Sequence, residues 1–309
     1  MYIKLYYKFS NIVTCCFSQN GQQFACGDEK GVLSLWNLGN IFRNPTLMDL
    51  HSSSLDHMLF HSSLLFTGFF DGTSKIIDFC VCKTIRTLKS IDFNRIYDLD
   101  CNKEITMILN NTGTVKFWDN RSKHPIESIT HGTHIQRAQF SQKPFVFFTA
   151  GILPEIFIWD IRKIEKKKAR KFKLNEKKFQ INSLVVSKKN KFLFISDIEN
   201  NYFQYYINFP IEWINSRRIQ NVPALSKNFS EKYLKISCDI EGNYIGYGNQ
   251  YGNIFIWSQK TGKIIYNIKD HYGKVNQVNF HPNNKIFCSC AKDNNVIIRK
   301  FHINKTPNI

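Results

Sequence analysis

The stretches GTVKFWDNRS (113–122) and EIFIWDIRK (155–163) carry one short pattern, in which an apolar run leads into Trp-Asp and a basic residue follows. Trp118 and Trp159 are 41 residues apart. A period of roughly 40–45 residues that ends in Trp-Asp is typical of a chain built from repeated small β-sheets. The same spacing is therefore expected along the rest of the chain.

The spacing continues in both directions. Backward it stays at 41 residues, and forward it lengthens to 47, 51 and 42 residues. The seven units end near Trp36, Ile77, Trp118, Trp159, Tyr206, Trp257 and Arg299. Together they use nearly all of the 309 residues, so we expect a single closed domain over residues 1–309.

Each unit consists of short runs rich in Val, Ile, Phe, Tyr and Thr, bounded by Gly, Asn, Asp and Ser, as strands and turns are. A repeated four-strand unit of this length predicts an all-β, seven-bladed β-propeller. The last unit supplies three strands, whereas YIKLYY (2–7) is a spare strand. Because an open ring would expose sheet edges, we expect this segment to pair with NVIIRKF (295–301) and close the ring.

The chain resembles the WD40-repeat family over almost its whole length. The resemblance is most specific at the Trp-Asp pairs 118–119 and 159–160, at DGT (71–73) and at DHYGKVNQVNFHP (270–282). It implies that a blade can hold a buried His, Ser/Thr, Asp and Trp in one hydrogen-bonded set. The Asp six residues before the Trp position is present at Asp71 and Asp293, and the leading histidine is expected at His51, His131 and His271. No unit shows the full set, so the chain is identified as a divergent member.

Two stretches interrupt the period. RKIEKKKARKFKLNEKK (162–178) follows the fourth unit, and part of it fits an outer strand while the rest fits an exposed loop. It either contacts phosphate or an acidic partner or is a solvated basic loop. The candidate contact residues are Lys166, Lys167, Lys168, Arg170 and Lys171.

The second interruption, 208–232, carries Trp213 outside the repeat register, and PIEWINSRRI (210–219) could form one helical turn. Trp and Arg are common anchors of protein interfaces. Trp213 is therefore either an interaction anchor or a residue that fixes the insertion to the propeller.

The net charge of +18 suits an acidic partner such as nucleic acid. A composition rich in Lys, Asn, Ile and Phe, as AT-rich coding produces, explains the charge without such a partner, so direct nucleic-acid contact is possible but not favoured. The nine cysteines, several of them inside strand-like runs, indicate a reduced, intracellular protein. No apolar run reaches the length of a membrane span, and MYIKLYYKFSNIV lacks the apolar core of a signal peptide.

Catalytic and metal-binding motifs are missing from the sequence, so we expect no enzyme, no metal and no cofactor. Propellers hold loops on a stiff scaffold, and binding residues concentrate on such loops. The resemblance implies that one face of the ring around the central channel binds peptides or partner subunits. By register, the candidate residues of this face are Phe70, Asn111, Tyr233, Gln250, Tyr251, Tyr272 and Lys292.

One segment suggests a finer resemblance. KYLKISCDIEGNYIGYGNQYGNIFIW (232–257) is similar to the extra-sex-combs family of Polycomb propeller subunits. That similarity implies an aromatic cage for methylated lysine, in which Tyr233 would take part, although Lys232 stands where a second aromatic is expected. We expect a non-catalytic scaffold within a multiprotein complex, nuclear rather than cytoplasmic. The alternatives are a histone-peptide reader and an RNA-processing or ribosome-assembly factor that contacts RNA.

Overall fold

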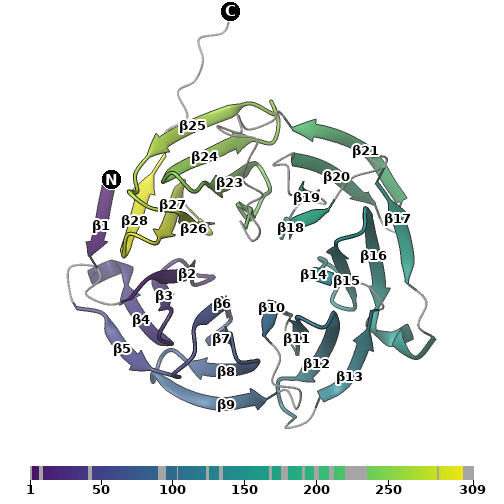
Figure 1. The fold of residues 1–309 in the computed structure, drawn as a ribbon, viewed down its shortest axis with the longest axis horizontal. Coiled ribbons are helices and arrows are strands. Elements are labelled where there is room, and N and C mark those ends of the chain that lie inside the picture. The colour runs from purple at the N-terminus through teal and green to yellow at the C-terminus, as the bar shows by residue number, and fades with distance from the viewer. Residues whose placement is uncertain are drawn as a thin grey trace, which may run out of the picture.

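Seven four-stranded antiparallel sheets are arranged as blades around a central axis (Figure 1). This computed structural model describes residues 2–6, 10–40, 44–89, 95–102, 104–122, 125–131, 135–166, 169–174, 180–189, 192–197, 202–208, 212–219, 235–283 and 285–301. Across these ranges the chain is the all-β, seven-bladed propeller that the repeat predicts.

In blades 1 to 6 the strands follow chain order from the innermost strand outward, and in blade 7 the outermost strand is β1. Blade 1 comprises β2 (Ile12–Phe17), β3 (Gln23–Asp28), β4 (Val32–Asn37) and β5 (Thr46–Asp49). Blade 2 comprises β6 (Leu55–His61), β7 (Leu64–Phe69), β8 (Thr73–Asp78) and β9 (Lys83–Lys89). Blade 3 comprises β10 (Ile96–Cys101), β11 (Ile105–Asn110), β12 (Thr114–Asp119) and β13 (Pro125–Thr130). Blade 4 comprises β14 (Ile135–Phe140), β15 (Val146–Gly151), β16 (Glu155–Asp160) and β17 (Arg170–Lys173).

The remaining three blades follow the same plan. Blade 5 comprises β18 (Ile181–Val186), β19 (Phe192–Asp197), β20 (Tyr202–Asn208) and β21 (Glu212–Ile219). Blade 6 comprises β22 (Ser237–Cys238), β23 (Tyr244–Gly248), β24 (Asn253–Ser258) and β25 (Ile264–Lys269). Blade 7 comprises β26 (Val275–Phe280), β27 (Ile286–Ala291), β28 (Asn295–Lys300) and β1 (Tyr2–Tyr6). Two short 3-10 helices, η1 (Leu38–Asn40) and η2 (Ile161–Lys166), lie between strands of the described chain.

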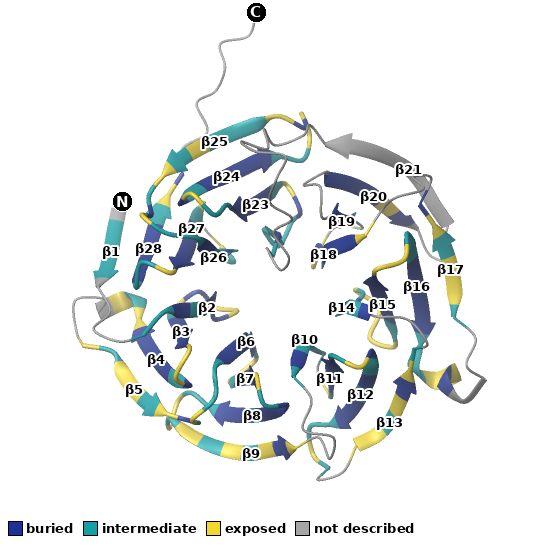
Figure 2. Cartoon of the chain, viewed as in Figure 1, coloured by how far each residue is buried: buried dark blue, intermediate teal, exposed yellow. Residues whose placement is uncertain are grey.

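Burial decreases from the inner strands to the outer strand of a blade (Figure 2). In β3, five of six residues are buried, because neighbouring blades cover both faces of the sheet. In β9, exposed and partly buried residues alternate along most of the strand, as expected for a strand with one face in solvent. The middle strands therefore need apolar side chains on both faces, and the outer strands on one.

The apolar clusters lie between blades rather than within them. One cluster joins Phe117 of blade 3 to Phe147 and Trp159 of blade 4. The Trp159 indole is nearly parallel to the Phe147 ring, with centroids 6.1 Å apart. Trp118 and Trp159 are both almost fully buried, which confirms that the repeated tryptophans fill the wedge between sheets.

Turns between the second and third strands of a blade are closed by an Asx side chain and a residue of positive φ. Gly72 and Gly113, which are 41 residues apart, have φ values of 84° and 75°, a backbone conformation that favours glycine. Asp71 and Asp293 are the acidic residues expected six positions before the Trp. In three other blades an Asx lies eight positions before it, and its side chain accepts a backbone N–H four residues on, as Asp28, Asn110 and Asn249 show.

Ring closure follows the prediction. β1 pairs antiparallel with β28, with Tyr2 opposite Arg299 and Tyr6 opposite Asn295. Ile3 and Leu5 pack on the cluster that joins blade 7 to blade 1. The N-terminal segment is therefore the outer strand of the last blade, and it holds the two ends of the chain together.

The structure corrects the interpretation of the two interruptions. Within 162–178, residues up to Lys166 belong to η2, and Arg170–Lys173 form β17, the expected outer strand of blade 4. Within 208–232, the predicted helical turn is wrong, because Glu212–Ile219 form β21 and Trp213 pairs with Ile207 of β20. The third strand of blade 5 needs a hydrogen-bonding partner on its outer edge, and β21 supplies it. Residues 220–234 lie outside the described part of the chain.

Candidate functional site

A cavity of about 180 Å³ opens in the central channel where the innermost strands begin. Six of the seven blades contribute to its wall. Its lining consists of Val13, Asp56, His57, Arg95, Ile96, Tyr97, Arg137, Lys235, Lys274 and Asn276. Four of these side chains are basic and one is a carboxylate, so the channel mouth is strongly positive.

Hydrogen bonds between blades hold the innermost strands in place. These strands lie at sheet edges, where backbone N–H groups need partners from outside the sheet. The Asp98 carboxylate accepts the N–H of Ala138 at 3.1 Å, and the Asp100 carboxylate accepts that of Phe140 at 2.8 Å. The side-chain oxygen of Gln139 accepts the N–H of Val186 at 2.7 Å in the same way. The wall of the channel is therefore tied together around the axis.

Arg95 is fixed at the rim of the cavity. Its Nε and Nη2 atoms donate to Asp56 Oδ2 at 3.2 and 2.9 Å. The other Asp56 oxygen accepts the Ser54 hydroxyl at 2.7 Å. The Phe70 ring lies over the guanidinium, 4.5 Å from its carbon atom, a cation–π contact. Ion pairing and ring contact thus set the direction of Arg95.

Deeper in the channel, Lys235 meets a neutral histidine. Its Nζ donates to His57 Nδ1 at 3.0 Å and to the Asp56 carbonyl oxygen at 3.3 Å. Burial, reinforced by the charges of Lys235, Arg137 and Arg95, holds the pKa of His57 well below its ordinary value. Because Nδ1 accepts a hydrogen bond from Lys235 and carries no proton of its own, the 3.7 Å approach of this atom to Asp98 is not an ion pair.

The same cations affect each other. Burial lowers the pKa of Lys235 to about 8, with Asp98, Asp56 and Cys290 opposing the decrease and Arg137 adding to it. Arg137 is almost fully buried, and its Nη1 donates to the Gln136 carbonyl oxygen at 2.8 Å. Burial also raises the pKa of Asp98, against the charges of Arg137 and Lys235. Several basic groups are therefore concentrated where charge is costly to bury.

Three of the predicted face residues lie next to this cavity. The backbone N–H of Asn111 donates to the Arg95 carbonyl oxygen at 2.9 Å, and that of Lys292 donates to the Lys274 carbonyl oxygen at 2.9 Å. Phe70 contacts Arg95 directly. The turns between second and third strands therefore share a face with the residues that precede the innermost strands.

The other predicted residues are distributed more widely. Gln250 and Tyr251 lie in the corresponding turn of blade 6, where the Tyr251 N–H donates to Asn249 Oδ1 at 3.0 Å. Tyr272 is 89% exposed, and Lys4 lies 5.9 Å from its ring centroid. Tyr233, Lys167 and Lys168 lie outside the described residues, as do the side chains of Lys166 and Trp213. Arg170 and Lys171 are exposed on β17.

The basic residues of the channel were missed by the sequence reasoning. These four residues are far apart in the sequence. Arg95, Lys235 and Lys274 precede an innermost strand by one or two residues, and Arg137 is the third residue of β14. Their places around the beginning of the innermost strand of each unit, 22 to 25 residues before the Trp position, were the available signal. The predicted face residues came from the turns of each unit, whereas these four residues face the axis.

The leading histidines form partial hydrogen-bonded sets. His271 Nδ1 lies 3.1 Å from both Asp293 carboxylate oxygens, and its Nε2 lies 2.8 Å from Ser289 Oγ. These three groups resemble the arrangement of a hydrolytic triad, but His271 and Ser289 are 1% and 0% exposed, so a substrate cannot reach them. In blade 4, Trp159 Nε1 donates to Thr149 Oγ1 at 3.0 Å, and His131 contacts the Trp159 ring. These sets stabilise the blades.

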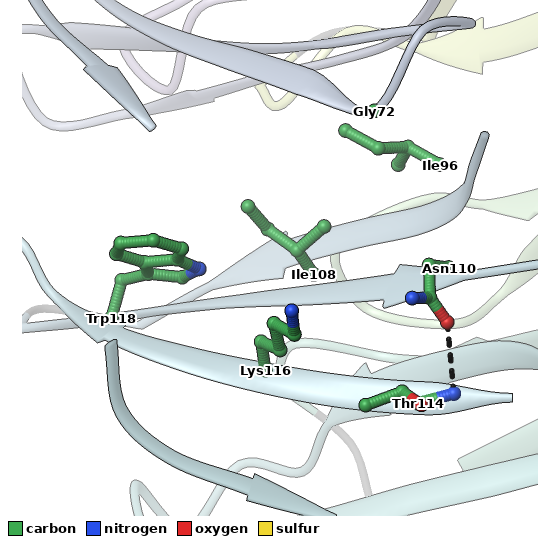
Figure 3. A pocket seen from close by; sticks show the side chains of 7 residues that line it. All are labelled: Gly72, Ile96, Ile108, Asn110, Thr114, Lys116 and Trp118. Atoms are coloured by element: carbon green, nitrogen blue, oxygen red, sulfur yellow. Dashed lines mark hydrogen bonds between the residues drawn. The ribbon is translucent and has the colours of Figure 1, made fainter. Parts of the chain in front are cut away.

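A second, much smaller cavity of about 10 Å³ lies between blades 2 and 3 (Figure 3). It is lined by Gly72, Ile96, Ile108, Asn110, Thr114, Lys116 and Trp118. A space of this size is at the lower limit for a single water molecule. It is a packing defect beside the Trp118 indole and is too small for a ligand. Among the described residues, no group of three or more His, Cys, Asp or Glu side chains is placed to hold a metal ion. The described helices are also too short to cross a membrane.

Comparisons with known proteins agree with this geometry. The family model for the WD domain, G-beta repeat, matches residues 4–37 and 262–299. The β-propeller domain of Myceliophteria thermophila Cps50 (Swd1) superposes with a TM-score of 0.83 at 12% identity, over 97% of this chain and 100% of that one. At that identity the structural likeness concerns the fold alone.

One relative is named as a pre-mRNA-splicing factor and another as a small nuclear ribonucleoprotein. The pre-mRNA-splicing factor cwf17 of Schizosaccharomyces pombe is 23% identical over 295 residues, which cover 94% of this chain and 84% of the relative. The U5 small nuclear ribonucleoprotein 40 kDa protein of Dictyostelium discoideum is 34% identical over 83 residues, 27% of this chain and 23% of the relative. The match therefore spans less than a quarter of the Dictyostelium protein.

The finer resemblance of 232–257 to the extra-sex-combs family is not supported by these comparisons. The repeat, the seven closed blades and the match of the first and last blades to the repeat model all agree on the broader family. This chain is a seven-bladed β-propeller that matches the WD-repeat model in two of its repeats, at residues 4–37 and 262–299.

Proposed function

We propose that this protein is a non-catalytic scaffold, a WD-repeat subunit of a nuclear ribonucleoprotein complex that acts in pre-mRNA splicing. The observation that carries the proposal is the similarity to the splicing factor cwf17, because it extends along 94% of this chain. A match of that length includes every blade, whereas a match to the repeat motif alone would cover one or two.

The geometry supports a binding role rather than catalysis. Among the described residues, the arrangement nearest to a catalytic set is His271, Asp293 and Ser289, and it is closed to substrate. Polar and charged groups line the accessible channel mouth. A rigid ring that presents charged groups on one face suits the assembly of other chains.

The test is purification of the tagged full-length chain from cells of its own source, followed by mass spectrometry and quantification of U5 small nuclear RNA. We expect enrichment of splicing proteins and of this RNA over an unrelated propeller that carries the same tag, together with nuclear fluorescence of a fusion protein. Recovery of the chain as a monomer, or with partners from an unrelated process, would contradict the proposal.

A nuclease arm separates two ways of joining such a complex. A scaffold that acts through protein contacts keeps its protein partners after RNase treatment of the lysate. If every partner is lost, the chain is attached through RNA, and its basic surface, at a net charge of +18, is then the contact.

A further inference from the structure

The channel cavity holds more positive charge than its own carboxylate can neutralise. Arg95, Arg137, Lys235 and Lys274 line it, and the one acidic side chain in the lining is Asp56. Both oxygens of that carboxylate are already engaged, one by Arg95 and the other by Ser54. Asp98, which does not line the cavity, also acts on Arg137 and Lys235, and the four basic groups still outnumber these two carboxylates.

The cations converge on one point. Lys235, Arg137 and Arg95 all act on the pKa of His57, and all three oppose its protonation. His57 stays neutral and accepts a hydrogen bond from Lys235, so it orients the ammonium group without cancelling its charge. Asp98 lies behind this group, where its oxygens accept the N–H groups of Ala138 and Leu99. Donors that are oriented in advance and share a partly buried cavity form strong charge-assisted hydrogen bonds to an anion.

The size of the cavity limits the ligand. Pockets that enclose a whole small molecule measure roughly 300–1,000 Å³, whereas this cavity measures about 180 Å³. It can therefore take the end of one side chain. A nucleic-acid strand would instead need a groove that follows its backbone and aromatic faces on which bases stack. At the rim, the half-exposed Phe70 ring is already occupied on one face by Arg95.

We propose that the mouth of the central channel binds one anionic side chain of a partner protein, with Arg137, Lys235 and Lys274 as its ligands and Phe70 as an apolar contact for the flanking segment. A carboxylate and a phosphorylated hydroxyl share this chemistry. The inference rests on the scaffold function proposed above, because it names the chemistry by which one partner is held.

The test uses the purified full-length chain and short fluorescent peptides of otherwise neutral sequence that carry one central Glu, phosphoserine or Gln. We expect the Glu or the phosphoserine peptide to bind and the Gln peptide to bind at least about tenfold more weakly. Comparison of the Glu and phosphoserine peptides identifies the source of the charge. Inorganic phosphate should compete with whichever peptide binds.

Lys274→Gln is the first variant, because this residue is only partly buried and its loss should leave the fold intact. Arg137→Gln is the second, and thermal unfolding shows whether it is folded. Lys83→Gln is the matched control, since it removes the same charge from the exposed outer strand β9. We expect both channel variants to bind the anionic peptide at least about tenfold more weakly than the wild type, and the control to bind it as the wild type does.

The proposal is overturned if the charged peptides bind no better than the Gln peptide, or if a folded channel variant binds them as the control does. It is also overturned if single-stranded oligouridine binds the channel and the peptides do not. Peptide binding without splicing partners in the cell would reject the proposed function and keep the site. If Lys274→Gln retains its splicing partners and no peptide binds, the proposed site is rejected and the proposed function is kept.

Discussion

Trp118 and Trp159 occupy equivalent positions in adjacent blades but differ in the partner of the indole. Trp159 Nε1 donates to Thr149 Oγ1 at 3.0 Å. Among the described residues, no acceptor lies within hydrogen-bonding distance of Trp118 Nε1, although this atom is buried. We therefore predict that Trp159→Phe destabilises the protein more than Trp118→Phe does.

The magnitude follows from the two environments. Both replacements lose a similar amount of buried apolar surface, because the tryptophans are 4% and 7% exposed. Trp159→Phe also loses a hydrogen bond worth about 1 kcal/mol and leaves the buried Thr149 hydroxyl without this partner. Trp118→Phe instead removes a buried donor that costs about 1–3 kcal/mol when unsatisfied. The difference in the free energy of unfolding should be about 2 kcal/mol.

Urea unfolding followed by far-UV circular dichroism measures this difference, provided that the slope m is the same in all variants. Thr149→Val in the Trp159→Phe background is the control, because replacing both partners by apolar groups should recover part of the loss. Equal costs at the two positions, or a larger cost at Trp118, would show that the hydrogen-bonding argument is wrong.

Three further predictions concern ring closure and the channel. Removal of residues 1–6 exposes the edge of β28 and the apolar cluster that Ile3 and Leu5 cover. We therefore expect a lower midpoint of thermal unfolding, and oligomers that size-exclusion chromatography detects. A monomer with an unchanged midpoint would refute this prediction. Because the pKa of Lys235 is about 8, its charge is lost as the pH rises through that value. Binding of an anionic peptide should therefore weaken between pH 7 and pH 9, and Lys235→Arg should flatten this pH profile. Equal pH profiles of the wild type and the variant would argue against Lys235 as a ligand. Burial raises the pKa of Asp100 to about 7. Its contribution to stability is therefore fully present below the unfolded pKa of about 4 and is lost as the pH rises through 7. Asp100→Asn should reduce the fall in the free energy of unfolding between pH 5 and pH 8, and an unchanged dependence of that free energy on pH would contradict the assignment.

The repeat was visible because a blade is a local unit. Strands, turns and the buried Trp position recur within about 42 residues, and each blade must present apolar side chains to both neighbours. Counting from Trp118 and Trp159 therefore located the units, and counting strands identified the N-terminal segment as the partner of β28. The same local reasoning failed in blade 5, where an irregular spacing made the outer strand β21 look like an insertion. It also failed at the Asx turns, where a search at one offset overlooked Asp28, Asn110 and Asn249.

The sequence by itself determined the number of blades, their four-strand plan and the way in which the ring closes, because these follow from a short-range period in apolar residues. Only the tertiary structure decided where the basic groups meet. Arg95 and Lys274 are 179 residues apart, yet both line the same cavity. No local pattern marks that meeting, since it arises from the closure of seven blades around one axis, which brings the first residues of distant innermost strands together.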